Sequence, residues 1–119
     1  MKKDNTSLTL DQFNTLVGKS TEIRGRLVLF DHARIDGKVV GNIESGDDKD
    51  ITIVIGRTGS VSGDITAHRV IVAGKVDGNV YAIDKAEIHE HAEILGDVHY
   101  GAIEIRDGSK LLGLAIPRA

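Results

Sequence analysis

The sequence has no cysteine, no tryptophan and a single proline, and its two Phe and two Tyr residues give an aromatic content of only 3%. Without cysteine there is no disulfide, no zinc-thiolate site and no cysteine nucleophile, and we expect a protein of the reducing cytoplasm. With so few aromatic side chains, the core must be built from aliphatic ones. The length of 119 residues predicts a single domain.

Strong charge of one sign is also missing. The net charge is −3 and the basic residues are spread along the chain, so there is no basic field to bind a phosphate backbone. GKVVG at 37–41 and GKVDG at 74–78 contain Gly-Lys, but not at the spacing of a phosphate-binding loop. No apolar run reaches the length of a signal sequence or a membrane span. We therefore expect no nucleic acid and no nucleotide as partner, and no export or transmembrane segment.

What the sequence does have is a recurring five-residue unit: an aliphatic residue, any residue, Gly, a polar residue and a second aliphatic residue. It reads IRGRL (23–27), VVGNI (39–43), VSGDI (61–65), VDGNV (76–80) and ILGDV (94–98), with a degenerate copy LLGLA (111–115). The central glycines are Gly25, Gly41, Gly63, Gly78, Gly96 and Gly113. The spacing between successive central glycines is roughly 18 residues. The longest step contains ESGDDKD at 44–50, which we interpret as an insertion.

Between these units lies an alternating aliphatic pair, whose two members share one face of a strand. The pairs are Ala33 and Ile35, Ile53 and Ile55, Val70 and Val72, Ala86 and Ile88, and Ile103 and Ile105. When the repeats are aligned, each supplies about four inward aliphatic residues. Equivalent residues of successive repeats are then expected to stack in two columns. The columns are Ile55, Val72, Ile88 and Ile105, and Val61, Val76, Ile94 and Leu111.

These patterns predict an all-β, single-domain β-solenoid of about six rungs, because a repeat this small buries its apolar face only by stacking on its neighbours. A β-sandwich is the competing interpretation, since it also has short alternating strands joined by Gly turns. A sandwich would not hold one five-residue unit in register six times, and its core usually contains aromatic side chains.

Several of these segments together resemble the bactofilin domain, over about residues 16–116. They are LVGKSTEIRGRL (16–27), RIDGKVVGNI (34–43), VIGRTGSVSGDI (54–65) and VIVAGKVDGNV (70–80). The resemblance implies a right-handed parallel β-helix that polymerises end to end without nucleotide and is not an enzyme. It also implies a peripheral place at the inner face of the cytoplasmic membrane, where the polymer organises cell-shape or envelope proteins. The chain departs from the family in its 44–50 insertion and in its short tails, at 1–15 and 117–119.

The two ends of a solenoid expose unpaired backbone groups and a slice of apolar core, so we expect them to form the polymer interface. The candidate interface residues are Leu16, Val17, Leu111, Leu112, Leu114 and Ile116. At the N-terminal end an alternative stays open. Phe13, Leu16 and Val17 have the i, i+3, i+4 spacing of a short amphipathic turn that would cap this end.

The N-terminal tail is also a candidate membrane contact. Its basic and apolar side chains are Lys2, Lys3, Leu8, Leu10 and Phe13. One such tail binds a bilayer marginally, whereas many tails on one filament multiply the weak contacts. The sequence leaves open whether the tail binds membrane or caps the solenoid.

The alternative function is a hexapeptide-repeat enzyme, either an acyltransferase or a zinc carbonic-anhydrase-like protein, since those solenoids have rungs of similar length. A small aliphatic residue should then recur at every sixth position. The walk from Val61 instead meets Ala67, Ala73, Asn79 and Lys85. This spacing argues against the enzyme.

A metal site is disfavoured too. A zinc site needs three convergent ligands, and His89, His91 and His99 are the one local cluster. Rung alignment places no His over another, and His89 should face solvent because Ile88 faces inward. Asp47, Asp48 and Asp50 of the insertion lack the spacing of a calcium loop. We therefore assign no catalytic residue, no metal ligand and no cofactor.

Overall fold

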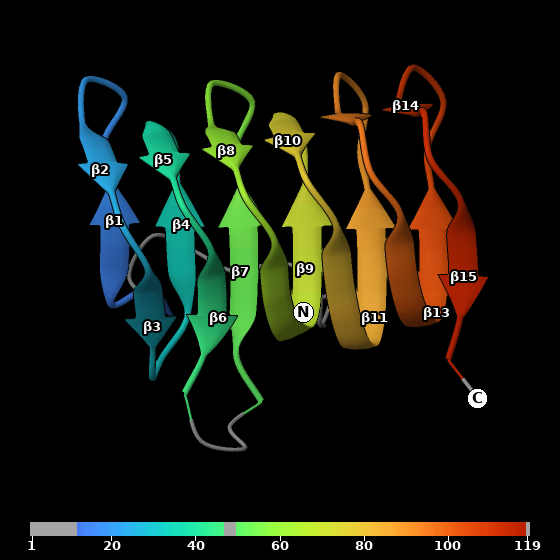
Figure 1. Ribbon diagram of the computed structural model, residues 1–119, viewed down its shortest axis with the longest axis horizontal. Helices are drawn as coiled ribbons and strands as arrows, with labels where there is room; N and C mark the ends of the chain where they lie inside the picture. The colour runs from blue at the N-terminus through green and yellow to red at the C-terminus, as the bar shows by residue number, and fades with distance from the viewer. Residues whose placement is uncertain (1–11, 47–49, 119) are drawn as a thin grey trace, which may run out of the picture.

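The computed structural model describes residues 12–46 and 50–118, and within these ranges it is built from strands that pair in parallel. The strands follow one another along a single axis, so that the first and last strands lie at opposite ends (Figure 1). One sheet has six strands in the order of their stacking, which corresponds to six turns of the chain. The predicted β-solenoid of about six rungs is confirmed.

Each turn contains three straight runs of backbone, which we call the first, second and third faces. The first face contains β1 (Thr15–Val17), β4 (Ala33–Ile35), β7 (Thr52–Ile55) and the second halves of β9 (Ile65–Val72), β11 (Val80–Ile88) and β13 (Val98–Ile105). The second face contains β2 (Glu22–Arg24), β5 (Lys38–Val40), β8 (Ser60–Ser62), β10 (Lys75–Asp77), β12 (Glu93–Ile94) and β14 (Lys110–Leu111). The third face contains β3 (Leu27–Leu29), β6 (Ile43–Ser45), the first halves of β9, β11 and β13, and β15 (Ala115–Pro117).

The predicted columns are present in the strand register. Ile55 pairs with Val72, Val72 with Ile88, and Ile88 with Ile105 on the first face. On the second face the register runs through Val61, Val76, Ile94 and Leu111. Most of these side chains belong to one continuous aliphatic core along the solenoid axis. Stacking like on like lets β-branched side chains pack in repeated rotamers, which favours this parallel arrangement.

A further inward column was not predicted. Ala67 pairs with Ala82, and Ala82 with Tyr100, at the corner between the third and first faces. Both alanines are fully buried. Each turn therefore places five side chains inward rather than four. A single alanine inside a strand gives no periodic signal of its own, which is why the pattern missed it.

Glycine marks the corner between the second and third faces. Gly41 has a φ of 143°, a conformation that side-chain-bearing residues rarely adopt. A Cβ atom on Gly41 would lie 2.0 Å from the carbonyl oxygen of Gly25 in the neighbouring turn. Backbones therefore approach at this corner to a distance that only glycine permits.

The polar residue that follows the central glycine of the five-residue unit has a structural role. Its side-chain oxygen accepts a hydrogen bond from the backbone N–H at the same position of the next turn, at a distance of 2.9 Å. The acceptors are Asn42, Asp64, Asn79 and Asp97. We call this series the Asx ladder. It satisfies corner N–H groups that lie outside the regular strands. The equivalent positions of the first and last turns are Arg26 and Leu114.

The predicted insertion at 44–50 begins inside β6, where Glu44 and Ser45 pair with Val28 and Leu29, so the extra residues follow Ser45 and precede β7. Residues 47–49 are outside the described ranges. On either side of the insertion the register with β9 is regular: Ile43 pairs with Ile65, and Ile53 with Val70. The described residues on both sides of the insertion therefore keep the register of the stack.

Candidate polymer interface

The two ends of the solenoid differ in how far their core side chains are covered. Val17 and Ile105 are the first and last members of the same inward column. Val17 is only 4% exposed, whereas Ile105 is 53% exposed. The C-terminal end is therefore the more open end of the core.

The C-terminal end face is formed by the last inward residues of each column. Ile103, Ile105 and Leu111 occupy these positions, and Ile103 and Leu111 are partly buried against the core. The side chains beneath them, Ile88 and Ile94, are fully buried. An additional turn at this end would bury Ile105 as Ile88 is buried now.

The six residues predicted for the interface do not all lie on an end face. Val17 and Leu111 occupy inward columns, at the N-terminal and C-terminal ends respectively. Leu16 and Ile116 lie at outward positions, in register with Arg34 and His99. Leu112 follows the inward Leu111, and its backbone N–H donates a hydrogen bond to the carbonyl of Ile94. Leu114 is at the last position of the Asx ladder, and both it and Leu112 are about two-thirds exposed.

Sequence reasoning missed Ile103 and Ile105 as end-face residues. The signal was available, because both are the last members of inward columns that the alternating pairs had identified. Apolar character near the chain terminus does not distinguish them, because outward leucines such as Leu112 share it with the inward Leu111.

Backbone at both ends lies at the edge of a sheet. The order of pairing places β1 and β2 last at the N-terminal end, and β14 and β15 last at the C-terminal end. Edge strands present N–H and C=O groups that another strand can pair with. The end faces thus offer apolar side chains and strand edges together.

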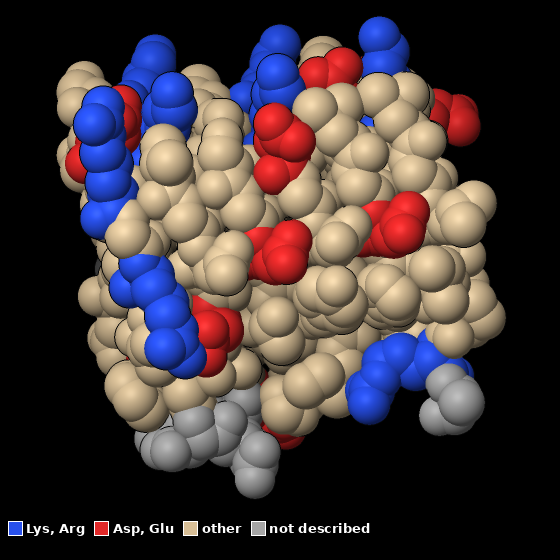
Figure 2. Space-filling model, viewed as in Figure 1, with Lys and Arg blue, Asp and Glu red and all other residues tan. Residues whose placement is uncertain are grey.

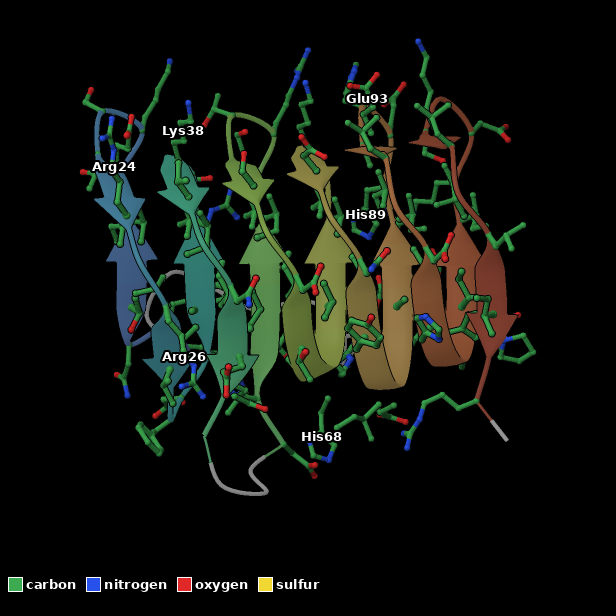
Figure 3. The ribbon with its side chains drawn as sticks, viewed as in Figure 1. Arg24, Arg26, Lys38, His68, His89 and Glu93 are labelled. Carbon is green, nitrogen blue, oxygen red and sulfur yellow. The ribbon has the colours of Figure 1, made fainter. Side chains whose placement is uncertain are left out.

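Paired charges surround these end faces. At the N-terminal end Arg26 donates two hydrogen bonds to Glu44, at 2.8 and 2.7 Å (Figure 3), and these bonds hold the pKa of Glu44 below its usual value. At the C-terminal end the hydrogen bond from Arg106 to Glu104, at 2.7 Å, likewise lowers the pKa of Glu104. Each carboxylate is held ionised by its arginine partner. The periphery of each end face, which we call its rim, is therefore charged, while the centre of the end face is apolar.

Basic side chains also follow one corner of the solenoid. Lys38, Lys75 and Lys110 each begin a strand of the second face, and Figure 2 shows Lys and Arg gathered along this edge. Glu22 and Glu93 occupy the same register column. The edge is therefore mixed in sign rather than uniformly basic, which does not favour a nucleic-acid interface.

The predicted membrane-contact residues fall mainly outside the described part. Lys2, Lys3, Leu8 and Leu10 lie there. Phe13 is described and is 7% exposed, so its ring does not face solvent. No helix within the described residues is long and apolar enough to cross a bilayer.

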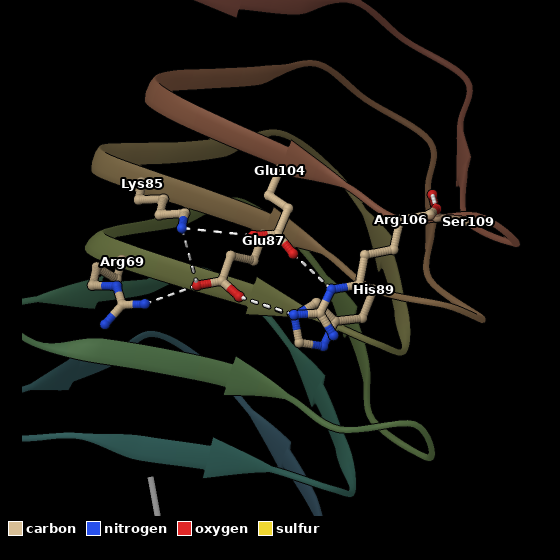
Figure 4. Close-up of polar contacts among 7 residues, drawn as sticks. All are labelled: Arg69, Lys85, Glu87, His89, Glu104, Arg106 and Ser109. Atoms are coloured by element: carbon tan, nitrogen blue, oxygen red, sulfur yellow. Dashed lines mark hydrogen bonds and ion pairs between the residues drawn. The ribbon is translucent and has the colours of Figure 1, made fainter. Parts of the chain in front are cut away.

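A polar cluster on the outer side of the first face was not predicted (Figure 4). Glu87 lies at its centre and is 1% exposed, although it alternates with the inward Ala86 and Ile88. Arg69 donates a hydrogen bond to Glu87 at 2.8 Å, and a ring nitrogen of His89 lies 3.1 Å from its other oxygen. Nitrogen atoms of Lys85 and Arg106 lie within 3.9 Å of Glu87.

This cluster changes the interpretation of His89. The ring was predicted to be solvated, but its side chain is only 26% exposed and contacts Glu87. His99 instead stacks on Tyr81, its register partner on the third face, with ring centroids 4.7 Å apart. No group of three or more potential metal-ligating side chains converges among the described residues.

A shallow pocket of about 460 Å³ lies beside this aromatic stack on the third face. It is lined by Thr66, Tyr81, Ile83, His99 and Arg118. Arg118 donates a hydrogen bond to the carbonyl of Ile83 at 2.9 Å. The pocket is open, and its lining combines Arg118 and the polar side chains of Thr66, Tyr81 and His99 with the apolar Ile83.

Comparisons with known proteins agree with this geometry. The family profile described as "Bactofilin: Polymer-forming cytoskeletal" matches residues 15–115. Bactofilin BacO of Myxococcus xanthus is 32% identical over 100 residues, which cover 84% of this chain and 76% of BacO. Bactofilin BacP of the same organism is 29% identical over 100 residues, and the chain spans only 40% of BacP.

A solved structure has the same architecture. The cryo-EM reconstruction of Thermus thermophilus bactofilin double helical filaments matches with a TM-score of 0.73 at 26% identity, covering 88% of this chain and 98% of that one. The similarity therefore covers most of the solenoid.

Proposed function

Because this chain belongs to the bactofilin family of polymer-forming cytoskeletal proteins, we propose that its subunits assemble end to end, without nucleotide, through the terminal turns of the solenoid. The observation that carries this proposal is the exposure of Ile105, at 53%, above the fully buried Ile88 of the same column. An added subunit would cover Ile105 and continue the column.

Two interactions continue across such a junction. The edge strands at each end can pair with a second backbone, and the apolar centres can pack against each other. Both are presented by the folded subunit as it stands, so no nucleotide-driven change is needed to create them. The charged pairs at the rims, such as Arg106 with Glu104, remain in contact with water and restrict the alignment of the two faces.

In the cell we propose a cytoplasmic filament held at the inner face of the cytoplasmic membrane by its N-terminal tails, where it organises cell-shape or envelope proteins. The basic Lys2 and Lys3 and the apolar Leu8 and Leu10 support this membrane contact. Repetition of the tail along a filament supplies the avidity that a single tail lacks.

The proposal is tested by negative-stain electron microscopy of the purified protein without added nucleotide. The parent should form filaments. Ile105→Lys places a charge on the end face, where a second subunit must desolvate it, so we expect folded subunits that no longer elongate. Leu95→Lys is the matched control, because Leu95 is exposed at an outward position of the second face, in the turn before the last, rather than on the end face.

Filaments from the parent and from Leu95→Lys, but not from Ile105→Lys, would support growth through the C-terminal end. Circular dichroism and melting of both variants check that the solenoid is intact. Long filaments from a folded Ile105→Lys variant would contradict the proposal and would place the junction elsewhere.

A further inference from the structure

The aromatic stack on the third face leaves one ring face open. Tyr81 and His99 are register partners in successive turns, and their rings are nearly parallel, with an interplanar angle of 13° and centroids 4.7 Å apart. His99 therefore covers one face of the Tyr81 ring. The opposite face is turned toward Thr66, the register partner of Tyr81 in the preceding turn. Because the side chain of Thr66 is short, the pocket that these residues line extends to that open ring face.

A guanidinium group lines the same pocket. The backbone N–H of Arg118 donates a hydrogen bond to the carbonyl of Tyr100, and its Nη1 donates one to the carbonyl of Ile83 at 2.9 Å. The side chain therefore reaches from the end of β15 across β13 to β11, and Gly101 of β13 presents no side chain in its way. The contact with Ile83 uses one of the five N–H donors of a guanidinium group. Arg118 is thus held in place while most of its donors stay available.

Arg118 differs from most arginines of this protein in its charge partner. Ion pairs with carboxylates are formed by Arg24, Arg26, Arg34, Arg69 and Arg106. Arg118 forms no such pair within residues 12–46 and 50–118, and its side chain is positioned by a neutral carbonyl instead. A guanidinium group that is fixed in place without a counter-charge favours an anion with planar oxygen geometry, such as a carboxylate.

The openness of the pocket limits what can carry that carboxylate. A small molecule is usually covered over most of its surface by its binding site, and an open pocket on the side of the solenoid does not provide this cover. A strand cannot be added here either, because β9, β11 and β13 are paired on both edges. The last residue of a polypeptide meets both limits, since it needs a place for only one side chain and one terminal group.

We propose that this pocket binds the C-terminal residue of a partner protein whose chain ends in an aromatic side chain. The terminal carboxylate accepts hydrogen bonds from Arg118. The aromatic ring stacks on the open face of Tyr81, over Thr66, and Ile83 packs against its edge. The pocket therefore recognises two features together, a terminal negative charge and a flat apolar ring.

A filament would repeat this pocket at regular intervals. The six turns of one subunit span roughly 29 Å, so pockets of successive subunits would recur at that distance. Weak single contacts then add up for partners that are clustered together. This consequence rests on the proposed filament, whereas the binding site belongs to the single subunit.

Fluorescence anisotropy of labelled peptides, titrated with the full chain, tests the site. The probe is a short fluorescein-labelled peptide that ends in phenylalanine with a free carboxylate. A second peptide has the same sequence and a C-terminal amide, and a third ends in alanine with a free carboxylate. We expect saturable binding of the probe. The amide should bind at least about ten-fold more weakly, because it lacks the charge-assisted hydrogen bonds to the carboxylate.

Variants assign the two contacts. Arg118→Gln should weaken binding of the probe at least about ten-fold and leave the affinity of the amide unchanged, because both changes remove the same interaction. Tyr81→Leu should reduce the affinity of the probe to that of the alanine peptide. Arg57→Gln is the matched control: Arg57 is exposed at the corner between the first and second faces, and in the described part of the chain it too forms no ion pair. Circular dichroism and melting check that each variant is folded.

Three results would overturn the proposal: no saturable binding of the probe, equal binding of probe and amide, or full binding by folded Arg118→Gln. Free phenylpropionate, which carries the same ring and carboxylate, separates a chain terminus from a small aromatic acid. If it displaces the probe at the same concentration as the unlabelled peptide does, the pocket takes a small acid and the partner assignment is wrong. Probe binding by a protein that forms no filaments would contradict the proposed function and leave this site standing, whereas filaments that do not bind the probe would contradict only the site.

Discussion

The side-chain oxygen of Asn79 accepts a hydrogen bond from the backbone N–H of Asp97, one turn further along the solenoid, at 2.9 Å. The same relationship links Asp64 to Asn79 and Asp97 to Leu114. The polar position of the five-residue unit is thus a hydrogen-bond acceptor for the next turn, and it connects the sequence repeat to the structural one.

Asn79→Ala should therefore lower the free energy of unfolding by about 1 kcal/mol, the net value of one such hydrogen bond, because the N–H of Asp97 loses its acceptor. Chemical denaturation followed by circular dichroism measures the change. Asp77→Ala, at an exposed position of β10 two residues earlier, is the control for a side-chain truncation outside the ladder. An Asn79→Ala variant as stable as Asp77→Ala would show that the ladder contributes no stability.

The inward columns make a stronger prediction. Val76 is fully buried between Val61 and Ile94, so Val76→Asp places an unpaired charge in the aliphatic core. We expect a loss of several kcal/mol or failure to fold. Asp77→Ala, one residue further and exposed, should change stability by no more than about 0.5 kcal/mol. Unchanged melting of Val76→Asp would contradict the column assignment.

How much of this the sequence could predict depends on whether a residue repeats. Val76 and Ile94 were placed correctly because each has an equivalent in every turn, and the resemblance based on those units is confirmed by the family profile. Glu87 has no such equivalent: a Glu between two inward residues is usually solvated, and only its neighbours in space reveal its burial. For the end faces, the sequence identifies apolar residues near a terminus. It does not show whether each side chain points into the core or away from it.

Glu87→Gln should destabilise the solenoid, because Gln cannot balance the charge of the mostly buried Arg69, which hydrogen-bonds Glu87 at 2.8 Å. A loss of about 1–3 kcal/mol is expected for a buried hydrogen-bonded charge. Thermal and chemical unfolding measure it. Glu104→Gln changes an exposed carboxylate of the same cluster and should have the smaller effect; equal effects would mean that burial of Glu87 contributes nothing.

Membrane binding should require both the tail and the polymer. Parent filaments should co-sediment with vesicles containing anionic lipid, whereas Ile105→Lys subunits, which retain the tail but do not elongate, should remain largely in the supernatant. A Leu8→Ser, Leu10→Ser variant that still forms filaments tests the tail alone. If it pellets with vesicles as the parent does, those leucines are not the anchor.

The last prediction separates growth through the end from association through the sides. Leu114 occupies the final corner of the Asx ladder and is exposed, so Leu114→Lys costs the free subunit little, but it puts a charge where the next turn must pack. Ile116 pairs in register with His99 on the outer side of the third face, so Ile116→Lys adds a charge to the side of the solenoid. We expect Leu114→Lys to run as a folded monomer or dimer in size-exclusion chromatography, while Ile116→Lys keeps forming filaments. A dimer would mean that the N-terminal end makes a separate self-contact, since one blocked end still permits one junction. The opposite outcome, with filaments lost only in Ile116→Lys, would place the junction on the side of the solenoid.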